Sequence, residues 1–360
     1  MRPFDLVANE IEKGMTGSNQ GLSIGLPRAS KYIGMRRGIY TTIVSGTGMG
    51  KSSVLHHNYI LTPYEEFIKS GKKENLKIFL FSMERPKVYL LAKWLSRKIF
   101  MDQGILIPVA KMLGWWDIKL TMDEKNLIHH YADYINEMIE GGYVEIHDGQ
   151  HNPTHIYKIV KKYAESTGKF EEVNEFSKVY IPNDPTATVE VALDTFGLLK
   201  KEKDLPTKKD VIEKQSEYFQ WFRDSLNYFC IGISQINRDI ASPTLLKIGD
   251  VEPSMETIKE SGRIAEDSDI IISVFDPLRY DIQGTLERDR IGYNPYKFEN
   301  KENNARHYRR LKILKNSYGE SDFAIATVLH GPTGILRELP KKNDITDEIC
   351  ASVLSGSYFL

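Results

Sequence analysis

The 360-residue chain is poor in cysteine, in long apolar runs and in net charge, and each shortage excludes a class of protein. Its two cysteines, Cys230 and Cys350, are too few for a thiolate zinc site or a framework of disulfides. No apolar run approaches the ~18 residues that a membrane-spanning helix needs, and the first residues lack the apolar stretch of a secretory signal. We therefore expect a cytoplasmic protein without a membrane partner.

The balance of charge excludes one mode of nucleic-acid binding. The chain has 48 Lys and Arg against 49 Asp and Glu, a net charge of −1, so a single copy lacks the positive field that captures nucleic acid nonspecifically. With 41% hydrophobic and 27% charged residues, the composition is that of a globular protein. Any contact with nucleic acid must therefore be local, or concentrated by the assembly of several copies.

Short apolar segments alternate with amphipathic ones from residue 21 onward. This pattern predicts an α/β fold, with a mostly parallel central sheet flanked by helices and with antiparallel strands towards the C-terminus. Strands are expected at 39–44, 76–82, 143–147, 189–193, 229–234, 270–275, 311–314 and 323–330. Helices are expected at 52–70, 87–101, 123–139, 153–167, 208–227 and 254–266. We expect an N-terminal arm at 1–20, one main domain at 21–340 and a C-terminal tail at 341–360.

A glycine-rich segment, SGTGMGKS, follows the first expected strand and leads into a helical pattern. Strand, glycine loop and helix in this order form a Walker A motif, in which backbone amides and the helix N-terminus bind phosphate. Lys51 would reach the β- and γ-phosphates of a nucleotide such as ATP, and Ser52 would hold Mg²⁺. The residues expected to contact the nucleotide are Ser45, Gly46, Thr47, Gly48, Met49, Gly50, Lys51, Ser52 and Ser53.

Polar residues at the ends of three other expected strands complete this site. Asp194 follows strand 189–193, Glu84 follows strand 76–82, and Gln235 follows strand 229–234. Parallel strands end at the same edge of a sheet, so these side chains can converge on the phosphate loop. We expect Asp194 to support Mg²⁺ and Glu84 to orient the attacking water. Gln235 would sense the γ-phosphate or link hydrolysis to motion.

Six segments in order carry a resemblance to a known family. They are GLSIGLPRASKYIGMRRGIYTTIVSGTGMGKSS, FLFSMERP, VEVALDTFGLL, IGISQINRD, IKESGRIAEDSDIIISVF and ILKNSYG. Their succession resembles the motif series of the RecA-fold ATPase domain of DnaB-family replicative helicases. The phosphate loop is closest in style to those of phage primase-helicases and Twinkle-type mitochondrial helicases. The compact form and motif style suggest a phage or plasmid source, and a phage protein would act in the host cytoplasm.

The resemblance implies a RecA-like P-loop NTPase core that assembles as a homo-oligomer, a hexameric ring around single-stranded DNA. Such a ring helicase translocates 5′ to 3′ as it hydrolyses ATP during replication. Lys51, Glu84 and Gln235 would serve hydrolysis, and Lys315 would reach the γ-phosphate bound to the neighbouring subunit. The residues implied in gripping the DNA backbone are Arg238, Lys259, Glu260 and Gly262. Only a short arm precedes residue 21, so a primase, loader or polymerase would be a separate protein.

One position departs from the family pattern. Relatives carry an arginine two residues after the lysine of ILKNSYG, where this chain has Ser317. Serine cannot place a guanidinium on the transition-state charge. Arg309 and Arg310 lie at least five residues back along the strand, about 16 Å at ~3.3 Å per residue, so neither is expected to substitute directly. Another arginine, for example from the polar stretch 281–310, would have to serve.

Two other functions stay open. The missing arginine favours a RecA-fold ATPase without unwinding activity, used in recombination, loading, packaging or regulation. A small-molecule P-loop kinase is a third class, but it leaves the segments KESG and SQINR unexplained.

Several further features receive structural interpretations. The arm's apolar stripe of Phe4, Leu6, Val7 and Ile11 is expected to dock on an adjacent subunit. We interpret three tryptophans as packing residues, namely Trp115, Trp116 and Trp221.

We do not expect a metal site at the histidines His147, His151 and His155, because Asn152-Pro153 would interrupt a helix that carried all three. The stretch 281–310 is expected to be a surface insertion. The final SGSYFL is expected to expose its aromatics, either to dock a partner or as a disordered end.

Overall fold

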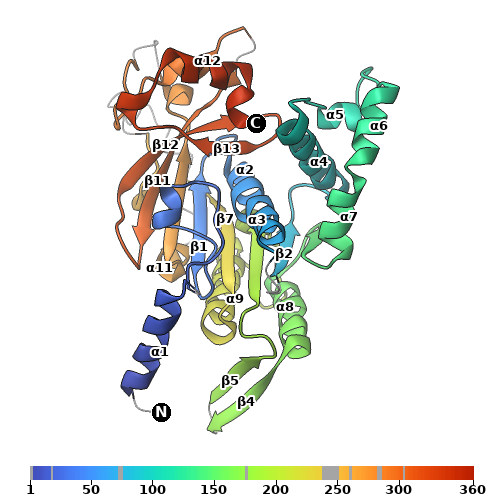
Figure 1. Ribbon diagram of the computed structural model, residues 1–360. Coiled ribbons are helices and arrows are strands. Elements are labelled where there is room, and N and C mark those ends of the chain that lie inside the picture. Colours follow the sequence, from blue (N-terminus) through green and yellow to red (C-terminus); the bar gives the residue numbers. More distant parts are fainter. Residues whose placement is uncertain are drawn as a thin grey trace.

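The computed structural model describes residues 3–17, 19–71, 76–174, 177–236, 251–258, 262–281, 286–302 and 305–360. Its centre is a nine-stranded sheet in the order β13-β12-β11-β8-β1-β7-β6-β2-β3 (Figure 1). The six strands from β8 to β3 run parallel, and β11, β12 and β13 are antiparallel. The predicted fold class, a mostly parallel sheet with C-terminal antiparallel strands, is therefore confirmed.

The carboxyl ends of the parallel strands meet at one edge of this sheet. Register pairs Ser45 at the end of β1 with Gln235 at the end of β7, and Ser82 at the end of β2 with Asp194 at the end of β6. The strands of the sheet are β1 Tyr40–Ser45, β2 Leu76–Ser82, β3 Val144–Asp148, β6 Thr188–Asp194, β7 Phe229–Gln235, β8 Ile270–Phe275, β11 Tyr308–Asn316, β12 Phe323–His330 and β13 Ile335–Glu338.

Helices cover both faces of the sheet, as a parallel sheet requires. Alternation along β6 shows the two layers, because Val191 and Leu193 pack in one hydrophobic cluster and Ala192 packs in the other. The cluster around Ala192 contains residues of the π-helical segment Val54–Leu61, α3 (Thr62–Ser70), α4 (Lys87–Gln103) and α7 (Ala132–Glu140). The cluster on the other face contains residues of α8 (Pro153–Thr167), α9 (Lys208–Leu226) and α11 (Gly262–Asp267).

The remaining elements lie around this core. Helix α1 (Pro3–Met15) projects from the body, on the opposite side of the molecule from α5 (Val109–Met112) and α6 (Met122–His130) (Figure 1). The others are α2 (Lys51–Ser53), α12 (Asp347–Ser355), the hairpin of β4 (Gly168–Asn174) and β5 (Ser177–Pro182), and the short pair β9 (Glu299–Asn300) and β10 (Ala305–Arg306). Among the described residues, no helix is both long and apolar enough to cross a membrane.

Some expected elements differ from the observed ones. The helix expected at 123–139 is divided at Tyr131 into α6 and α7. The helix expected at 254–266 contains a short 3₁₀ turn at Met255–Thr257 and α11, while residues 259–261 lie outside the described part. The β4–β5 hairpin was not expected, because its sequence is polar and alternates without a strong apolar face.

Two of the three tryptophans interpreted as packing residues are exposed. The exposed fractions of Trp115 and Trp116 are 45% and 81%, whereas Trp221 packs against the cluster on the α8–α9 face. Helical spacing suggested a buried face, but α5 ends at Met112 and the chain turns at Gly114, whose φ is +67°. The interpretation is therefore wrong for Trp116, because no helix continues through it, whereas Trp115, though partly exposed, stacks on Tyr89 of α4 with ring centres 6.0 Å apart.

Two segments expected at the surface contribute to a third hydrophobic cluster. Phe359 is fully buried there, so the expectation that the final aromatics are exposed is wrong for this residue. Tyr293 and Phe298 from the stretch 281–310 are buried in the same cluster, beside Tyr308 of β11. The Tyr358 hydroxyl donates to Glu338 O of β13 at 2.6 Å, which ties the C-terminus to the sheet.

Candidate nucleotide site

The glycine-rich segment forms a tight loop between β1 and α2. Every residue of β1 is buried, and the chain leaves the sheet at Ser45 and enters the helix at Lys51. Gly48 and Gly50 have φ of +75° and +114°, which a side chain disfavours. A Cβ on Gly50 would also lie 2.9 Å from Leu329 Cδ2 of β12. Both backbone conformation and close packing therefore require glycine at position 50.

The Lys51 ammonium group lies against the loop that it follows. Its Nζ donates to Ser45 O at 3.1 Å and to Gly46 O at 2.9 Å. Met49 anchors the other side of the loop, since it is buried beside Val251 and Phe275. The loop thus holds a cation at the N-terminus of a helix, which is the arrangement that attracts a phosphate.

Asp194 presents a buried carboxylate to the same edge. It is 2% exposed, and its Oδ2 lies 3.4 Å from His56 Nε2 of the π-helical segment that follows α2. Its Oδ1 is buried without a hydrogen-bond partner among the described residues. A hard cation such as Mg²⁺ prefers carboxylate and hydroxyl oxygens, so the orphaned Oδ1 and the hydroxyl of Ser52, four residues before His56, suit a magnesium ion. These residues therefore fit the implied metal.

Gln235 and Glu84 lie at this edge on either side of Asp194. Gln235 Nε2 donates to the hydroxyl Oγ1 of Thr47 at 2.7 Å, which joins the end of β7 directly to the phosphate loop. Glu84 is exposed two residues after Ser82, and Met83 N donates to Asp194 O at 2.8 Å. The structure thus brings the loop, Asp194 and Gln235 together, and it leaves Glu84 open to solvent beside them.

Two arginines at the loop were missed from the sequence. Arg279, in the turn after β8, donates through Nη1 to Thr47 O. Arg309 Nε donates to Met49 O at 2.9 Å, and its Nη1 lies 3.5 Å from Asp276 Oδ2. Burial lowers the pKa of Arg309, and the Asp276 carboxylate opposes this shift. The sequence offered one signal for Arg279: like Asp276, it follows the carboxyl end of an expected parallel strand, where residues of the nucleotide site gather.

Lys315 lies at the opposite edge of the sheet from the loop of its own chain. Its Nζ donates to Ala265 O and Glu266 O, both at 2.9 Å, near the C-terminal end of α11. Burial lowers its pKa. Ser317 is exposed at the same edge. Since β11 runs antiparallel to β8, its start contacts the phosphate loop and its end cannot.

The expected DNA-gripping residues are only partly described. Arg238, Lys259 and Glu260 lie outside the described residues. Gly262 is exposed at the first position of α11, with no atom within 4 Å of the place where a Cβ would stand.

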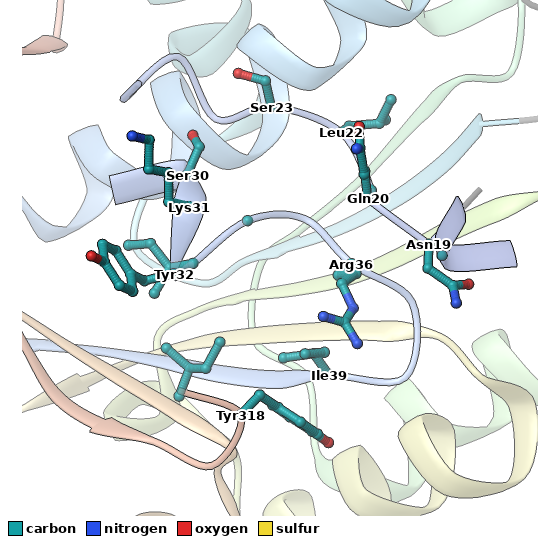
Figure 2. A pocket seen from close by; sticks show the side chains of 15 residues that line it. Asn19, Gln20, Leu22, Ser23, Ser30, Lys31, Tyr32, Arg36, Ile39 and Tyr318 are labelled. Carbon is teal, nitrogen blue, oxygen red and sulfur yellow. The ribbon is translucent and has the colours of Figure 1, made fainter. Parts of the chain in front are cut away.

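A cavity of about 500 Å³ lies away from the phosphate loop, beside the segment that follows α1 (Figure 2). The segment after α1 forms most of its wall, and Ile270 and Tyr318 close it from the sheet. Arg36 stands over Tyr318, with the guanidinium carbon 5.6 Å from the ring centre. None of the residues that line this cavity belongs to the candidate nucleotide site.

The three clustered histidines lie close together. The rings of His147 and His151 are 6.2 Å apart and those of His151 and His155 are 5.0 Å apart. Burial lowers the pKa of His147 and of His151. Within the described ranges, no group of three or more acidic, histidine or cysteine side chains is arranged to hold a metal ion.

The strand order and the loop after β1 define a RecA-type P-loop fold. A search of solved structures supports this class. The chain is similar to a structure described as an ATPase domain, with a TM-score of 0.66 and 15% identity over 94% of this chain and 100% of that one. It is also similar to "The Structure Of A DnaB-Like Replicative Helicase And Its Interactions With Primase", with a TM-score of 0.67 and 16% identity over 94% of this chain and 68% of that one.

Neither a scan against protein-family models nor a search of curated proteins gave a match. At identities of 15% and 16%, the structural likeness establishes the fold. The expected resemblance is confirmed at this level, because the chain has the RecA-type fold of DnaB-like helicase ATPase domains.

Proposed function

We propose that the protein is an ATP-dependent ring helicase that translocates on single-stranded DNA during replication. The observation that carries the proposal is the convergence of Lys51, Asp194 and Gln235 at one sheet edge, within a fold shared with helicase ATPase domains. Solvent-exposed Glu84 stands at the same edge. This set contains the cation, the metal-binding carboxylate and the base that nucleotide hydrolysis needs.

In the proposed reaction, the loop amides and Lys51 bind the β- and γ-phosphates and neutralise their charge. Ser52 and the orphaned Oδ1 of Asp194 hold Mg²⁺, which supplies further charge stabilisation when bound. Glu84 accepts a proton from the attacking water. Gln235, which bonds to Thr47 in this structure, moves to the γ-phosphate and so links the nucleotide state to β7.

We further propose that the protein works as a hexameric ring. A single chain has a net charge of −1, so a positive channel has to be built from several copies of one loop. The distance between Lys315 and the loop of its own chain supports a role for Lys315 at a neighbour's nucleotide. Arg238, Lys259, Glu260 and Gly262 would face the strand, and a primase, loader or polymerase would bind as a separate partner.

The decisive test of this function is the rate of ATP hydrolysis with and without oligo-dT, together with unwinding of a duplex that carries a 5′ single-stranded tail. We expect DNA to stimulate hydrolysis severalfold and the duplex to be unwound. Phosphate release is followed with a coupled assay and unwinding by strand-displacement fluorescence. A rate of ATP hydrolysis that is the same with and without DNA would contradict the helicase proposal.

The second candidate is a RecA-fold ATPase without unwinding activity. Exposed Ser317 at the edge that carries Lys315 favours it, because a serine there gives no guanidinium to a neighbouring nucleotide. This candidate predicts DNA-stimulated hydrolysis without strand displacement.

Helix α1 offers a surface for ring assembly. Phe4, Val7, Ile11 and Met15 form an apolar stripe with exposed fractions of 71%, 53%, 54% and 84%, while the side chain of Leu6 lies outside the described part. Large apolar side chains exposed along one helix face mark a protein contact. The segment between α5 and α6 lies on the opposite side of the molecule from α1 (Figure 1) and contains the exposed apolar residues Trp115, Trp116 and Ile118, which suits a head-to-tail contact between copies.

Ile11→Glu is expected to shift the protein from rings to smaller species, because it places a charge in the middle of the stripe. Mass photometry with a nonhydrolysable ATP analogue measures the distribution. Asn9→Glu is the matched control, since Asn9 is an exposed residue on the opposite face of the same helix. If both variants lose rings to the same extent, or if neither variant loses them, α1 is not part of the interface.

A further inference from the structure

Lys93 of α4 stands beside the candidate nucleotide site without a role in the scheme above. It lies next to the N-terminal turn of the helix that follows the phosphate loop. Lys93 and Ser53 both lie around Gly334, in the turn between β12 and β13. The position that a Cβ would occupy on Gly334 is 3.3 Å from Ser53 Oγ, 3.4 Å from Lys93 Cε and 3.5 Å from Lys93 Nζ. The Lys93 ammonium and the Ser53 hydroxyl thus border the same small space, one residue away from Ser52.

Charges around Lys93 indicate which side of the site it faces. Burial and the Arg85 guanidinium lower the pKa of Lys93, and the Asp194 carboxylate raises it. Arg85 follows Glu84, and Asp194 is the proposed metal ligand. The ammonium group is therefore close enough to interact electrostatically with the Asp194 carboxylate, and with Arg85, the residue that follows Glu84.

The ammonium group of Lys93 has no hydrogen-bond acceptor among the described residues. Lys93 is only partly exposed, and within the described ranges no residue accepts a hydrogen bond from its Nζ or forms an ion pair with it. A partly enclosed ammonium without an acceptor costs free energy that an anionic ligand can recover. A triphosphate bound at the loop would bring several anionic oxygens to this side.

We propose that Lys93 is a second cation of the nucleotide site, which donates to the γ-phosphate on the side of Asp194 while Lys51 holds it from the loop. The proposal rests on the proposed nucleotide-binding function. It gives the chain a positive group in cis at the transferring phosphate, in addition to any group that a neighbouring copy supplies. A charge-assisted contact of this kind discriminates a triphosphate from a diphosphate.

The test compares affinities for a fluorescent nonhydrolysable ATP analogue and for the matching ADP derivative. Lys93→Met keeps the apolar stem and removes the charge. We expect it to weaken binding of the triphosphate about tenfold, with little change for the diphosphate, as loss of one charge-assisted hydrogen bond implies. We expect kcat for hydrolysis to fall about tenfold or more, and Lys93→Arg to restore part of both quantities.

Lys98→Ala is the matched control, because Lys98 lies on the same helix and pairs with Asp102 at the surface, 2.8 Å away. It should leave both affinities unchanged. Equal losses for the two nucleotides in Lys93→Met, or no loss in a folded variant, would overturn the proposal. If Lys93→Met lowers the unfolding temperature, Lys93→Arg decides the question, since it keeps the charge and must retain the preference for triphosphate. Failure of the nucleotide-site function itself is recognised separately, by unchanged binding in Lys51→Ala.

Discussion

Lys51→Ala is expected to abolish ATP hydrolysis and to weaken binding of a nonhydrolysable ATP analogue by about 100-fold. The ammonium group bonds to Ser45 O and Gly46 O at the phosphate loop, so it is already placed where phosphate oxygens would arrive. Each charge-assisted hydrogen bond contributes about 1.5–3 kcal/mol, and alanine makes none. The measurement is a fluorescence titration with the analogue, followed by an assay of phosphate release.

Thermal unfolding gives an independent readout of the same variant. A ligand present at 100 times its Kd stabilises the folded state by about 2.7 kcal/mol, and at the same ligand concentration a 100-fold weaker affinity in Lys51→Ala reduces this increment to about 0.4 kcal/mol. Lys69→Ala serves as the control, because Lys69 is exposed near the end of α3 and far along the chain from the loop. Unchanged nucleotide affinity in Lys51→Ala would remove the basis of every functional assignment made above.

Glu84→Gln is expected to lower kcat about 1,000-fold and to leave the affinity for ATP within about threefold. A general base contributes 10²–10⁴-fold to proton transfer, and glutamine keeps the shape of glutamate without its basicity. Glu84 is exposed at the edge where Asp194 ends β6, so water can reach it. Single-turnover hydrolysis separates the chemical step from binding, and the same titration as for Lys51 measures affinity.

The outcome for Glu84 is informative in either direction. Glu140→Gln, at an exposed position on α7, controls for the loss of one surface charge and should hydrolyse ATP at the wild-type rate. If Glu84→Gln also keeps the wild-type rate while Lys51→Ala fails to bind nucleotide, the site binds ATP but another group orients the water. The function would then stand and the assignment of the base would be wrong.

Much of the sheet was predictable, because its strands are short apolar runs with clear ends. The expected strands at 76–82, 270–275 and 323–330 coincide with β2, β8 and β12. The expected helix at 153–167 coincides with α8, where Asn152 caps the first turn through His155 N at 2.8 Å. In these cases the signal is local, since hydrophobic periodicity and capping depend on neighbouring residues.

Burial of the aromatic residues was less predictable. Trp116 is exposed and Phe359 is buried, each against expectation. A tryptophan among apolar residues looks the same in the sequence whether or not a helix continues through it. Whether a terminal phenylalanine is covered depends on β11 and β12, which are distant in the chain, as well as on the neighbouring helix α12; all three supply residues of the third cluster.

The roles of the basic residues near the C-terminus depended on strand direction. Spacing along the chain suggested that Arg309 could not substitute for a group near Lys315, and the structure agrees that the two lie at opposite edges. It adds that Arg309 is the one that reaches the phosphate loop of its own chain, through Met49 O. Only the antiparallel pairing of β11 with β8 decides this, and nothing in the sequence of β11 fixes its neighbour.

The sequence by itself determined the phosphate loop, because positive φ at Gly48 and Gly50 and the adjoining helix are properties of contiguous residues. It also determined that polar strand ends would share an edge, since parallel strands leave no other arrangement. The tertiary structure alone decided which arginines and which lysine border that loop. Arg279, Arg309 and Lys93 come from separate elements, and their proximity arises from long-range packing that no local pattern encodes.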